Sequence, residues 1–226
     1  MTDQTENASL AGKVGLYALV MNYLPLVYLL AGVGLVWRMQ SVQAMIAAGV
    51  AWIYLLPPLT ARLVLLVMGS PEGHALPPRS RRFKVWWFLT QLQMVFNRLR
   101  FLEELLRLVP GLYSLWLNLW GSRVSLFVFW VSGVLITDRY LLNIGPGVIV
   151  SADAALAGHL STYDAHGNYV TSIARITIEK GAIIGARAGI GPGCVIGAFE
   201  VVPAGRLLPP YSRWRDGRRT KREIRS

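Results

Sequence analysis

Two long hydrophobic runs near the start of the chain predict membrane-spanning helices. Val14–Trp37 contains no charged residue, and Ser41–Met68 is a second hydrophobic run that is interrupted only by Arg62. Each run exceeds the roughly 20 residues that a helix needs to cross the core of a bilayer. Because only three residues separate them, we expect a transmembrane hairpin over residues 1–70, with a kink in its second helix at Pro57-Pro58.

A helical periodicity follows a linker rich in proline and glycine. From Phe88 to Leu106, hydrophobic residues recur every three or four positions and polar residues occupy the other faces, which predicts an amphipathic helix. Trp86 and Trp87 at its start favour a place at the membrane interface, and packing on a soluble domain is the alternative. Residues 71–120 are therefore expected to form a linker and an interfacial helix. Further aromatic residues are expected at the same headgroup level: Tyr113, Trp116 and Trp120.

The second half of the chain repeats every six residues. The branched apolar positions are Ile144, Val150 and Leu156, and then Ile178, Ile184, Ile190, Ile196, Val202 and Leu208. Small residues stand four positions after many of them, at Val148, Ala154, Ala182, Ala188 and Cys194. A triangular coil explains this spacing if each face is one short strand and three faces complete a turn. We expect the branched side chains to point into the coil, and the glycines that follow them to permit tight corners.

The hydrophobic segment Ser125–Ile136 precedes this repeat. It is too short to cross a membrane and is rich in strand-forming residues, so it is predicted to be strand.

The segment "ITIEKGAIIGARAGIGPGCVIG" (Ile176–Gly197) resembles the coils of the hexapeptide-repeat acyltransferases, and "PPYSRWRDGRRTKREIR" resembles their closing segment. The resemblance covers about Gly121–Arg225. With its membrane helices and the segment "ITDRYLLNIGPGVIV", the chain resembles the membrane-bound branch of that family. The resemblance implies a left-handed parallel β-helix over residues 121–210, a basic C-terminal tail over residues 211–226, and a homotrimer.

The repeat is interrupted between Leu156 and Ile178, which lie 22 residues apart, four more than three six-residue units. We expect the extra length to form a loop. His159 lies at the start of this interruption and matches the family's catalytic histidine. The resemblance implies that it is a general base, because an imidazole can take a proton from an attacking hydroxyl or amine near neutral pH. A surface turn residue is the alternative interpretation.

Two residues of the interruption are candidates for contact with the acceptor. Asp164 can orient an imidazole, and His166 lies in the polar stretch "DAHGN", which is typical of an exposed loop tip.

The resemblance also implies an acyl-CoA donor, with acetyl-CoA as the first choice, and no tightly bound cofactor. Backbone groups one coil apart hold the pantetheine in that family, and the matching positions are Ala186 and Ala204, which are three six-residue units apart. Basic side chains are candidates for contact with the phosphates. They are Arg187, Arg206, Arg218 and Lys221. No metal is expected, because no cluster of His, Asp and Glu has the spacing of a ligand set.

Composition and charge narrow the class of protein. Only 15% of residues are charged and 54% are hydrophobic, which is too apolar for an ordinary soluble domain. The net charge of +11 is concentrated after residue 206. Such a tail suits nucleic acid, an anionic membrane or a phosphorylated cofactor, or is a disordered tail. The hairpin tip carries only Arg38, whereas Arg79–Lys84 contains four basic residues, so the positive-inside rule places both termini in the cytosol.

These features predict a multi-pass protein of the bacterial inner membrane with its catalytic domain in the cytosol. We expect an O- or N-acyltransferase whose acceptor is a membrane-associated glycan, lipid or lipid-linked precursor. A trimeric, membrane-anchored scaffold without catalysis is one alternative. Binding of anionic lipid or nucleic acid through the basic tail is the other, although no segment resembles a nucleic-acid-binding module.

Overall fold

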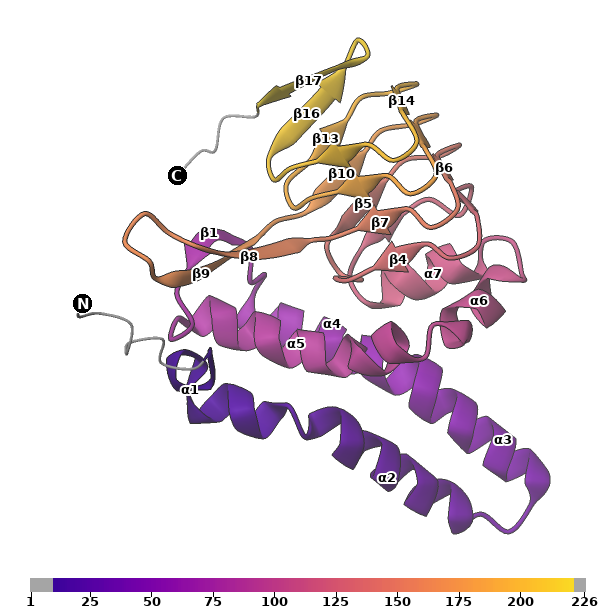
Figure 1. Ribbon diagram of the computed structural model, residues 1–226. Helices are drawn as coiled ribbons and strands as arrows, with labels where there is room; N and C mark the ends of the chain where they lie inside the picture. Colours follow the sequence, from indigo (N-terminus) through magenta and orange to yellow (C-terminus); the bar gives the residue numbers. More distant parts are fainter. Residues whose placement is uncertain (1–9, 222–226) are drawn as a thin grey trace.

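The computed structural model describes residues 10–221, in which a layer of helices carries a stack of short strands (Figure 1). The helices are α1 (Leu10–Met21), α2 (Leu24–Trp37), α3 (Val42–Val50), the π-helical turn η1 (Ala51–Leu55), α4 (Leu56–Met68), α5 (Arg81–Arg98), α6 (Phe101–Arg107) and α7 (Leu112–Leu119). The strands are β1 (Gly73–Leu76), β2 (Arg123–Val124), β3 (Phe129–Trp130), β4 (Leu135–Ile136), β5 (Leu142–Ile144), β6 (Ile149–Val150), β7 (Ala155–Leu156), β8 (His159–Tyr163), β9 (Tyr169–Ile173), β10 (Ile176–Ile178), β11 (Ile183–Ile184), β12 (Gly189–Ile190), β13 (Val195–Ile196), β14 (Val201–Val202), β15 (Leu207–Leu208), β16 (Ser212–Arg215) and β17 (Arg218–Lys221).

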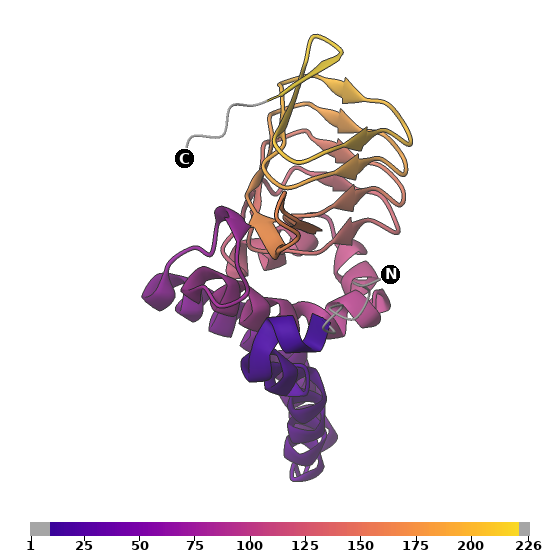
Figure 2. The ribbon, with the colours of Figure 1, turned by 60° about the vertical axis from the view of Figure 1, so that its left-hand side comes forward.

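Three parallel sheets form the faces of a β-helix. Their strand orders are β16-β13-β10-β5-β2, β14-β11-β6-β3 and β15-β12-β7-β4, and Figure 2 shows the resulting coils stacked on one another. Ile178 pairs with Ile196 on the next coil, so one turn takes three six-residue units, as the repeat predicts. Every branched position predicted to point inward is buried, with at most 2% of its surface exposed, and the small positions are fully buried.

The repeat extends beyond the residues that reveal it in the sequence. Val124 and Ile136 precede it, and Trp214 follows it, each buried inside the coil. Trp214 lies on β16, which pairs in parallel with β13 and then turns back into β17. The segment expected to be a basic tail from residue 211 is therefore part of the β-helix and a closing hairpin as far as Lys221. The rest of that tail lies outside the described residues.

Glycine serves the coil in two different ways. The glycines that directly follow the branched positions allow coils to approach, since a Cβ on Gly185 would lie 2.4 Å from the backbone nitrogen of Ala204. They do not have the left-handed backbone that a tight corner at these positions would require. That conformation occurs elsewhere, for example at Gly181 (φ 67°), where the Phe199 ring occupies the space of a Cβ.

The interruption of the repeat is a hairpin of β8 and β9. The chain advances by only one face between β7 and β10, so the 22 residues from Leu156 to Ile178 include 16 beyond one six-residue unit. The prediction of only four extra residues was wrong, because it allowed the segment a complete turn. The segment expected to be a linker contains a strand, because Gly73–Leu76 form β1 and pair with β9.

The predicted interfacial helix consists of two helices. α5 and α6 are separated at Leu99, whose backbone (φ −106°, ψ 68°) leaves the helical conformation. α5 contacts α1, α2 and α4 on one side, and Trp86 on α5 hydrogen-bonds to Asp138 of the β-helix. Four of the five aromatic residues expected at headgroup level are buried within the protein. Trp86, Tyr113, Trp116 and Trp120 each have 3% or less of their surface exposed.

Within residues 10–221, two helical segments are long and apolar enough to cross a membrane, Leu16–Trp37 and Val42–Met68. They lie side by side, with Tyr28 stacked on Trp52 at 5.3 Å between ring centroids. The prolines predicted to kink the second segment occupy the first turn of α4, where their missing N–H groups are tolerated. The distortion takes the form of η1 immediately before them.

Candidate active site

His159 lies at the corner where the chain leaves β7 and begins β8. Its Nδ1 atom is 2.7 Å from Oδ2 of Asp138, which comes from the preceding coil. The Asp138 side chain is completely buried, whereas 26% of the His159 side chain is exposed. Because a carboxylate accepts hydrogen bonds, Nδ1 carries the proton, and Nε2 is left with its lone pair as a base.

Two neighbours besides His159 fix the Asp138 carboxylate. The Thr137 hydroxyl donates to Oδ2 at 2.6 Å, and the Trp86 indole donates from Nε1 to Oδ1 at 3.1 Å. The Trp86 ring also lies 4.8 Å from the imidazole ring. Gly158 provides the space, since a Cβ there would lie 2.9 Å from Cβ of Asp138. The imidazole is therefore held on one side by a carboxylate and on another by an indole.

The two ionisable groups shift each other's pKa. Burial raises the pKa of Asp138, but the charge of His159 and hydrogen bonds from His159, Thr137 and Trp86 outweigh it and lower the pKa. Burial lowers the pKa of His159, but the charge of Asp138 and its hydrogen bond outweigh it and raise the pKa. The pair therefore favours a charged carboxylate beside an imidazole that readily takes up a proton.

Asp138, Thr137 and Trp86 were not among the site residues predicted from the sequence. Ile136 pairs with Leu156, so Asp138 falls opposite Gly158 and next to His159. The signal was present, but Ile136 and Ile144 are eight residues apart rather than six, which lengthens the first coil by two residues and hides the register. Nothing in the sequence pattern indicates the contact of Trp86, because it comes from a separate helix.

The two acceptor candidates of the interruption lie away from His159. His159 pairs with Ile173 at the base of the hairpin, whereas Asp164 follows Tyr163 at its tip. The Asp164 carboxylate accepts hydrogen bonds from the backbone N–H groups of His166 and Asn168, which shape the exposed turn. Asp138, and not Asp164, orients the imidazole.

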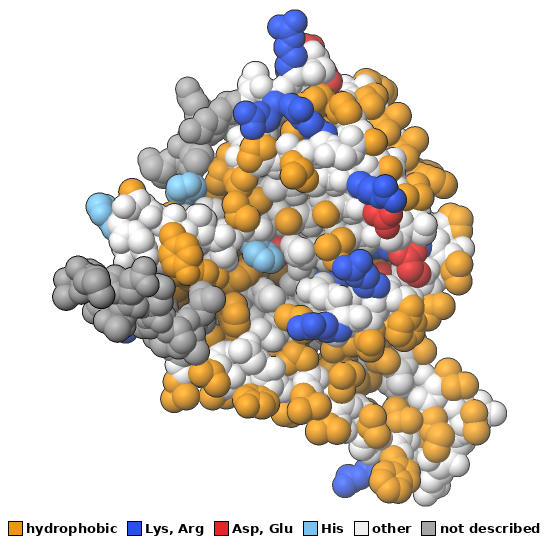
Figure 3. All heavy atoms as spheres, viewed as in Figure 1, with side chains coloured by type: hydrophobic (Ala, Val, Ile, Leu, Met, Phe, Trp, Pro, Cys, Tyr) orange, Lys and Arg blue, Asp and Glu red, His pale blue; other side chains and the backbone are white. Residues whose placement is uncertain are grey.

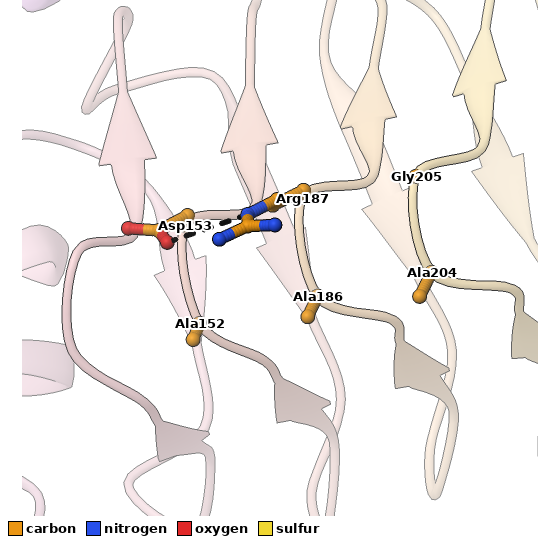
Figure 4. A pocket seen from close by; sticks show the side chains of 6 residues that line it. All are labelled: Ala152, Asp153, Ala186, Arg187, Ala204 and Gly205. Carbon is orange, nitrogen blue, oxygen red and sulfur yellow. Dashed lines mark ion pairs between the residues drawn. The ribbon is translucent and has the colours of Figure 1, made fainter.

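The predicted donor positions line a pocket of about 380 Å³ on another corner of the coil. Ala186 and Ala204 are on successive coils there, as Figure 4 shows, and neither backbone N–H group has a hydrogen-bond partner among the described residues. The exposed Arg187 side chain lies at the rim, with its Nε 3.9 Å from a carboxylate oxygen of Asp153. The pocket thus offers unpaired backbone donors and one cation.

The other basic side chains expected to contact the donor phosphates do not lie together in the structure. Arg206 follows Gly205 of the pocket, and its guanidinium lies 5.6 Å from the Trp214 ring centroid. Arg218 is on β17, the hairpin strand added to a different sheet, and so is not brought to the pocket. Lys221 pairs with Ser212 through the backbone on the same hairpin.

The base and the pocket occupy opposite edges of one sheet. Ala152 and Asp153 of the pocket precede β7, whereas His159 follows it, so the width of the β15-β12-β7-β4 sheet lies between them. A single described chain therefore does not bring His159 to the donor positions with which the sequence prediction grouped it.

Comparison with known proteins gives limited similarity. No protein-family model matches the chain, and no curated protein sequence matches it. A mutant of the N-acyltransferase AntD from Bacillus cereus, solved with dTDP-4-amino-4,6-dideoxyglucose and coenzyme A, aligns with a TM-score of 0.33 and 14% identity over 44% of this chain and 62% of AntD.

Two further solved structures are similar at the same level. A hexapeptide-repeat containing acetyltransferase from Vibrio cholerae aligns with a TM-score of 0.34 and 16% identity over 53% of this chain and 86% of its own. A maltose O-acetyltransferase from Clostridium difficile aligns with a TM-score of 0.26 and 16% identity over 52% and 79%. Scores this low carry no inference about activity, so the function has to be argued from this chain's own residues.

Proposed function

We propose that the protein is a membrane-bound acyltransferase that uses His159 as its general base. The donor is an acyl-CoA thioester, with acetyl-CoA as the first choice. The acceptor is a hydroxyl or amine of a membrane-associated glycan, lipid or lipid-linked precursor. The observation that carries this proposal is the buried Asp138 carboxylate, which holds an otherwise accessible imidazole so that Nε2 remains available.

The reaction needs one proton to move twice. Nε2 of His159 removes the proton from the acceptor as its oxygen or nitrogen attacks the thioester carbonyl. The tetrahedral intermediate then collapses, the carbon–sulfur bond breaks, and the imidazolium returns the proton to the leaving thiolate of coenzyme A. Asp138 stabilises the imidazolium between these steps, as the carboxylate does in other histidine-based acyl-transfer sites. Backbone N–H groups at a coil corner are suited to stabilise the oxyanion.

The proposal includes a homotrimer of left-handed coils, as the sequence resemblance implies. The β14-β11-β6-β3 face carries outward-pointing apolar residues, including the exposed Phe129 and Val201. A neighbouring copy packed on such a face can bring its own pocket to His159. This arrangement supplies the donor positions Ala186 and Ala204 that one chain holds at the opposite edge.

A direct assay tests the function. Purified protein in lipid nanodiscs is incubated with radiolabelled acetyl-CoA and a bacterial membrane extract, and both the free thiol and the labelled acceptor are measured. We expect label to be transferred to the extract in proportion to the thiol released. A protein that neither binds coenzyme A nor transfers label would contradict the proposal.

The dependence of activity on pH follows from the two pKa shifts. The base must be unprotonated, so we expect kcat/KM to fall as the pH drops below the raised pKa of His159. Asp138→Asn removes the charge that raises this pKa, so the acidic limb should move to lower pH. The maximal rate should also fall by about 10²–10⁴-fold, because a neutral amide has only one acceptor oxygen and holds the tautomer and the imidazolium less well than the carboxylate. A profile whose acidic limb does not move would assign the titration to another group.

Membrane topology gives a separate prediction. Gln40→Cys at the turn between α2 and α3 should react with a membrane-impermeant maleimide added to intact spheroplasts. Gly217→Cys between β16 and β17 should react only after the membrane is permeabilised, because the positive-inside rule leaves the β-helix in the cytosol. Both variants are made with Cys194→Ala, since alanine fills the equivalent position of other coils. The reverse labelling pattern would refute the orientation and its access to cytosolic acyl-CoA.

A further inference from the structure

Helices α6 and α7 expose apolar side chains, unlike the outward face of a helix in a soluble protein. Every exposed residue between Phe101 and Trp120 is apolar. The exposed set is Phe101, Leu105, Leu108, Val109, Pro110, Leu112 and Leu115. In contrast, Glu103 has only 2% of its surface exposed. The amphipathic pattern of the sequence places Glu103 off the apolar stripe, and the structure turns it inward.

The charged residues of α6 pair with one another and with the β-helix. Glu103 accepts a hydrogen bond from Nε of the fully buried Arg139 at 2.6 Å, and it lies 3.6 Å from Arg107. Arg107 also pairs with Glu104 and donates to the Val134 carbonyl at 2.9 Å. Because a buried ion needs partners, these pairs explain how the charges tolerate burial. These ion pairs do not explain why the exposed side of α6 carries leucines.

The contacts of Tyr54 fix the depth of these helices along the second apolar segment. The Tyr54 hydroxyl donates to the Leu102 carbonyl at 3.0 Å, and Nε1 of Trp116 donates to the Tyr54 carbonyl at 2.8 Å. On the side of Tyr54 that faces away from the β-helix, the second apolar segment consists of Val42 to Ile53. These residues span ~18 Å at ~1.5 Å per residue. A hydrocarbon core is ~30 Å thick. If the hairpin crosses the bilayer, α6 and α7 must lie partly within it.

The ends of α5 mark the height of the membrane surface. Between Val85 and Asn97 this helix has no exposed residue, and the exposed charged residues at its ends are all basic. They are Arg81, Arg82 and Lys84 at one end and Arg98 and Arg100 at the other. Such residues suit the phosphate layer of a bilayer. Figure 3 shows many hydrophobic side chains on the hairpin that projects at the lower right.

We propose that α6, α7 and the turn between them are immersed in the membrane leaflet that adjoins the β-helix. The proposal rests on the membrane anchoring in the proposed function and adds a second contact with lipid. It places α5 among the headgroups. Trp86 of α5 hydrogen-bonds to Asp138, and its ring lies against that of His159. His159 therefore lies close to headgroup level and reaches the reactive group of the acceptor there. The acceptor class is a molecule whose hydroxyl or amine belongs to a lipid headgroup or is linked close to one.

A second copy of the chain is the competing occupant of this surface. The bilayer is favoured because α7 packs against α4, part of a candidate membrane span whose Leu59, Leu63 and Leu66 are also exposed. A protein partner would have to cover a surface that merges with a membrane span.

Site-specific fluorescence quenching tests the immersion. Leu108→Cys and Leu115→Cys are made separately with Cys194→Ala, labelled with bimane and reconstituted as the full chain in nanodiscs. Leu59→Cys on α4 reports the membrane span, and Leu207→Cys on the last coil reports a soluble exposed leucine. We expect phospholipids brominated on their acyl chains to quench the label at positions 108, 115 and 59, with no loss of fluorescence at 207.

The outcomes separate this proposal from the proposed function. If position 59 is quenched by lipid while 108 and 115 respond only to aqueous iodide, the immersion is wrong and the anchoring stands. If position 59 is not quenched either, the membrane anchoring fails, and the immersion fails with it. Pyrene excimers at position 108 in place of lipid quenching would assign the surface to a second copy and overturn the proposal.

Discussion

His159→Ala is expected to lower kcat for acyl transfer by about 10²–10⁴-fold while leaving the affinity for coenzyme A nearly unchanged. The substitution removes the proton acceptor Nε2 and leaves the backbone donors of the pocket in place. Those donors belong to Ala186 and Ala204, which lie on other coils and at the opposite edge of the sheet. The loss should therefore appear in kcat, with binding of coenzyme A measured separately by calorimetry.

His166→Ala is the matched control for this substitution. His166 lies at the exposed tip of the β8–β9 hairpin, where its backbone N–H takes part in the turn around Asp164. We expect its kcat to equal that of the unaltered protein. A dead His166→Ala protein beside a fully active His159→Ala protein would assign the chemistry to the hairpin tip. Full activity of both variants would show that neither histidine is the general base and would favour the scaffold alternative.

Ile190→Asp is expected to prevent the β-helix from forming. Ile190 is 1% exposed inside the coil, and it pairs with Leu156 and Leu208 on the coils on either side. The substitution buries an unpaired carboxylate at a cost of several kcal/mol, or forces its pKa upward. A cost of this size rivals the whole stability of a typical domain, so the protein should aggregate or be degraded. Yield in membranes and circular dichroism of the purified fraction measure the effect.

Leu207→Asp provides the control with the same chemical change on the outside. Leu207 precedes Leu208 on β15 and has 73% of its surface exposed, so the new carboxylate stays in water. We expect normal folding of the monomer. An Ile190→Asp protein as stable as Leu207→Asp would show that Ile190 does not point into the coil.

The β-helix was predictable because its signal is local. Each six-residue unit places one branched residue inside, and neighbouring units repeat the same requirement, so the period from Ile178 to Leu208 predicts the face, the direction of each side chain and the turn of three units. The uncharged runs predicted the two long helices for the same reason, since length and hydrophobicity belong to the segment itself. His159 was predictable from its place beside the interruption and from the resemblance.

The sequence did not predict how much of the interruption leaves the coil. A spacing of 22 residues is compatible with a full turn plus four residues or with one face plus 16. The structure selects the second, because β9 gains β1 as a partner from a segment that has the composition of a linker. Pairing between segments so far apart in the chain leaves no periodic trace in either of them.

The sequence by itself therefore determined the repeating coil, the apolar helices and the histidine at the corner. Only the tertiary structure decided which groups surround that histidine and which face of α6 is buried. Asp138 reaches His159 through the pairing of coils, and Trp86 reaches both from a helix that is distant in the chain. Likewise, Glu103 turns inward because Arg139 is buried beneath it. A periodic pattern reports whether a residue is apolar, whereas the direction of a charged side chain is set by the partner that balances its charge.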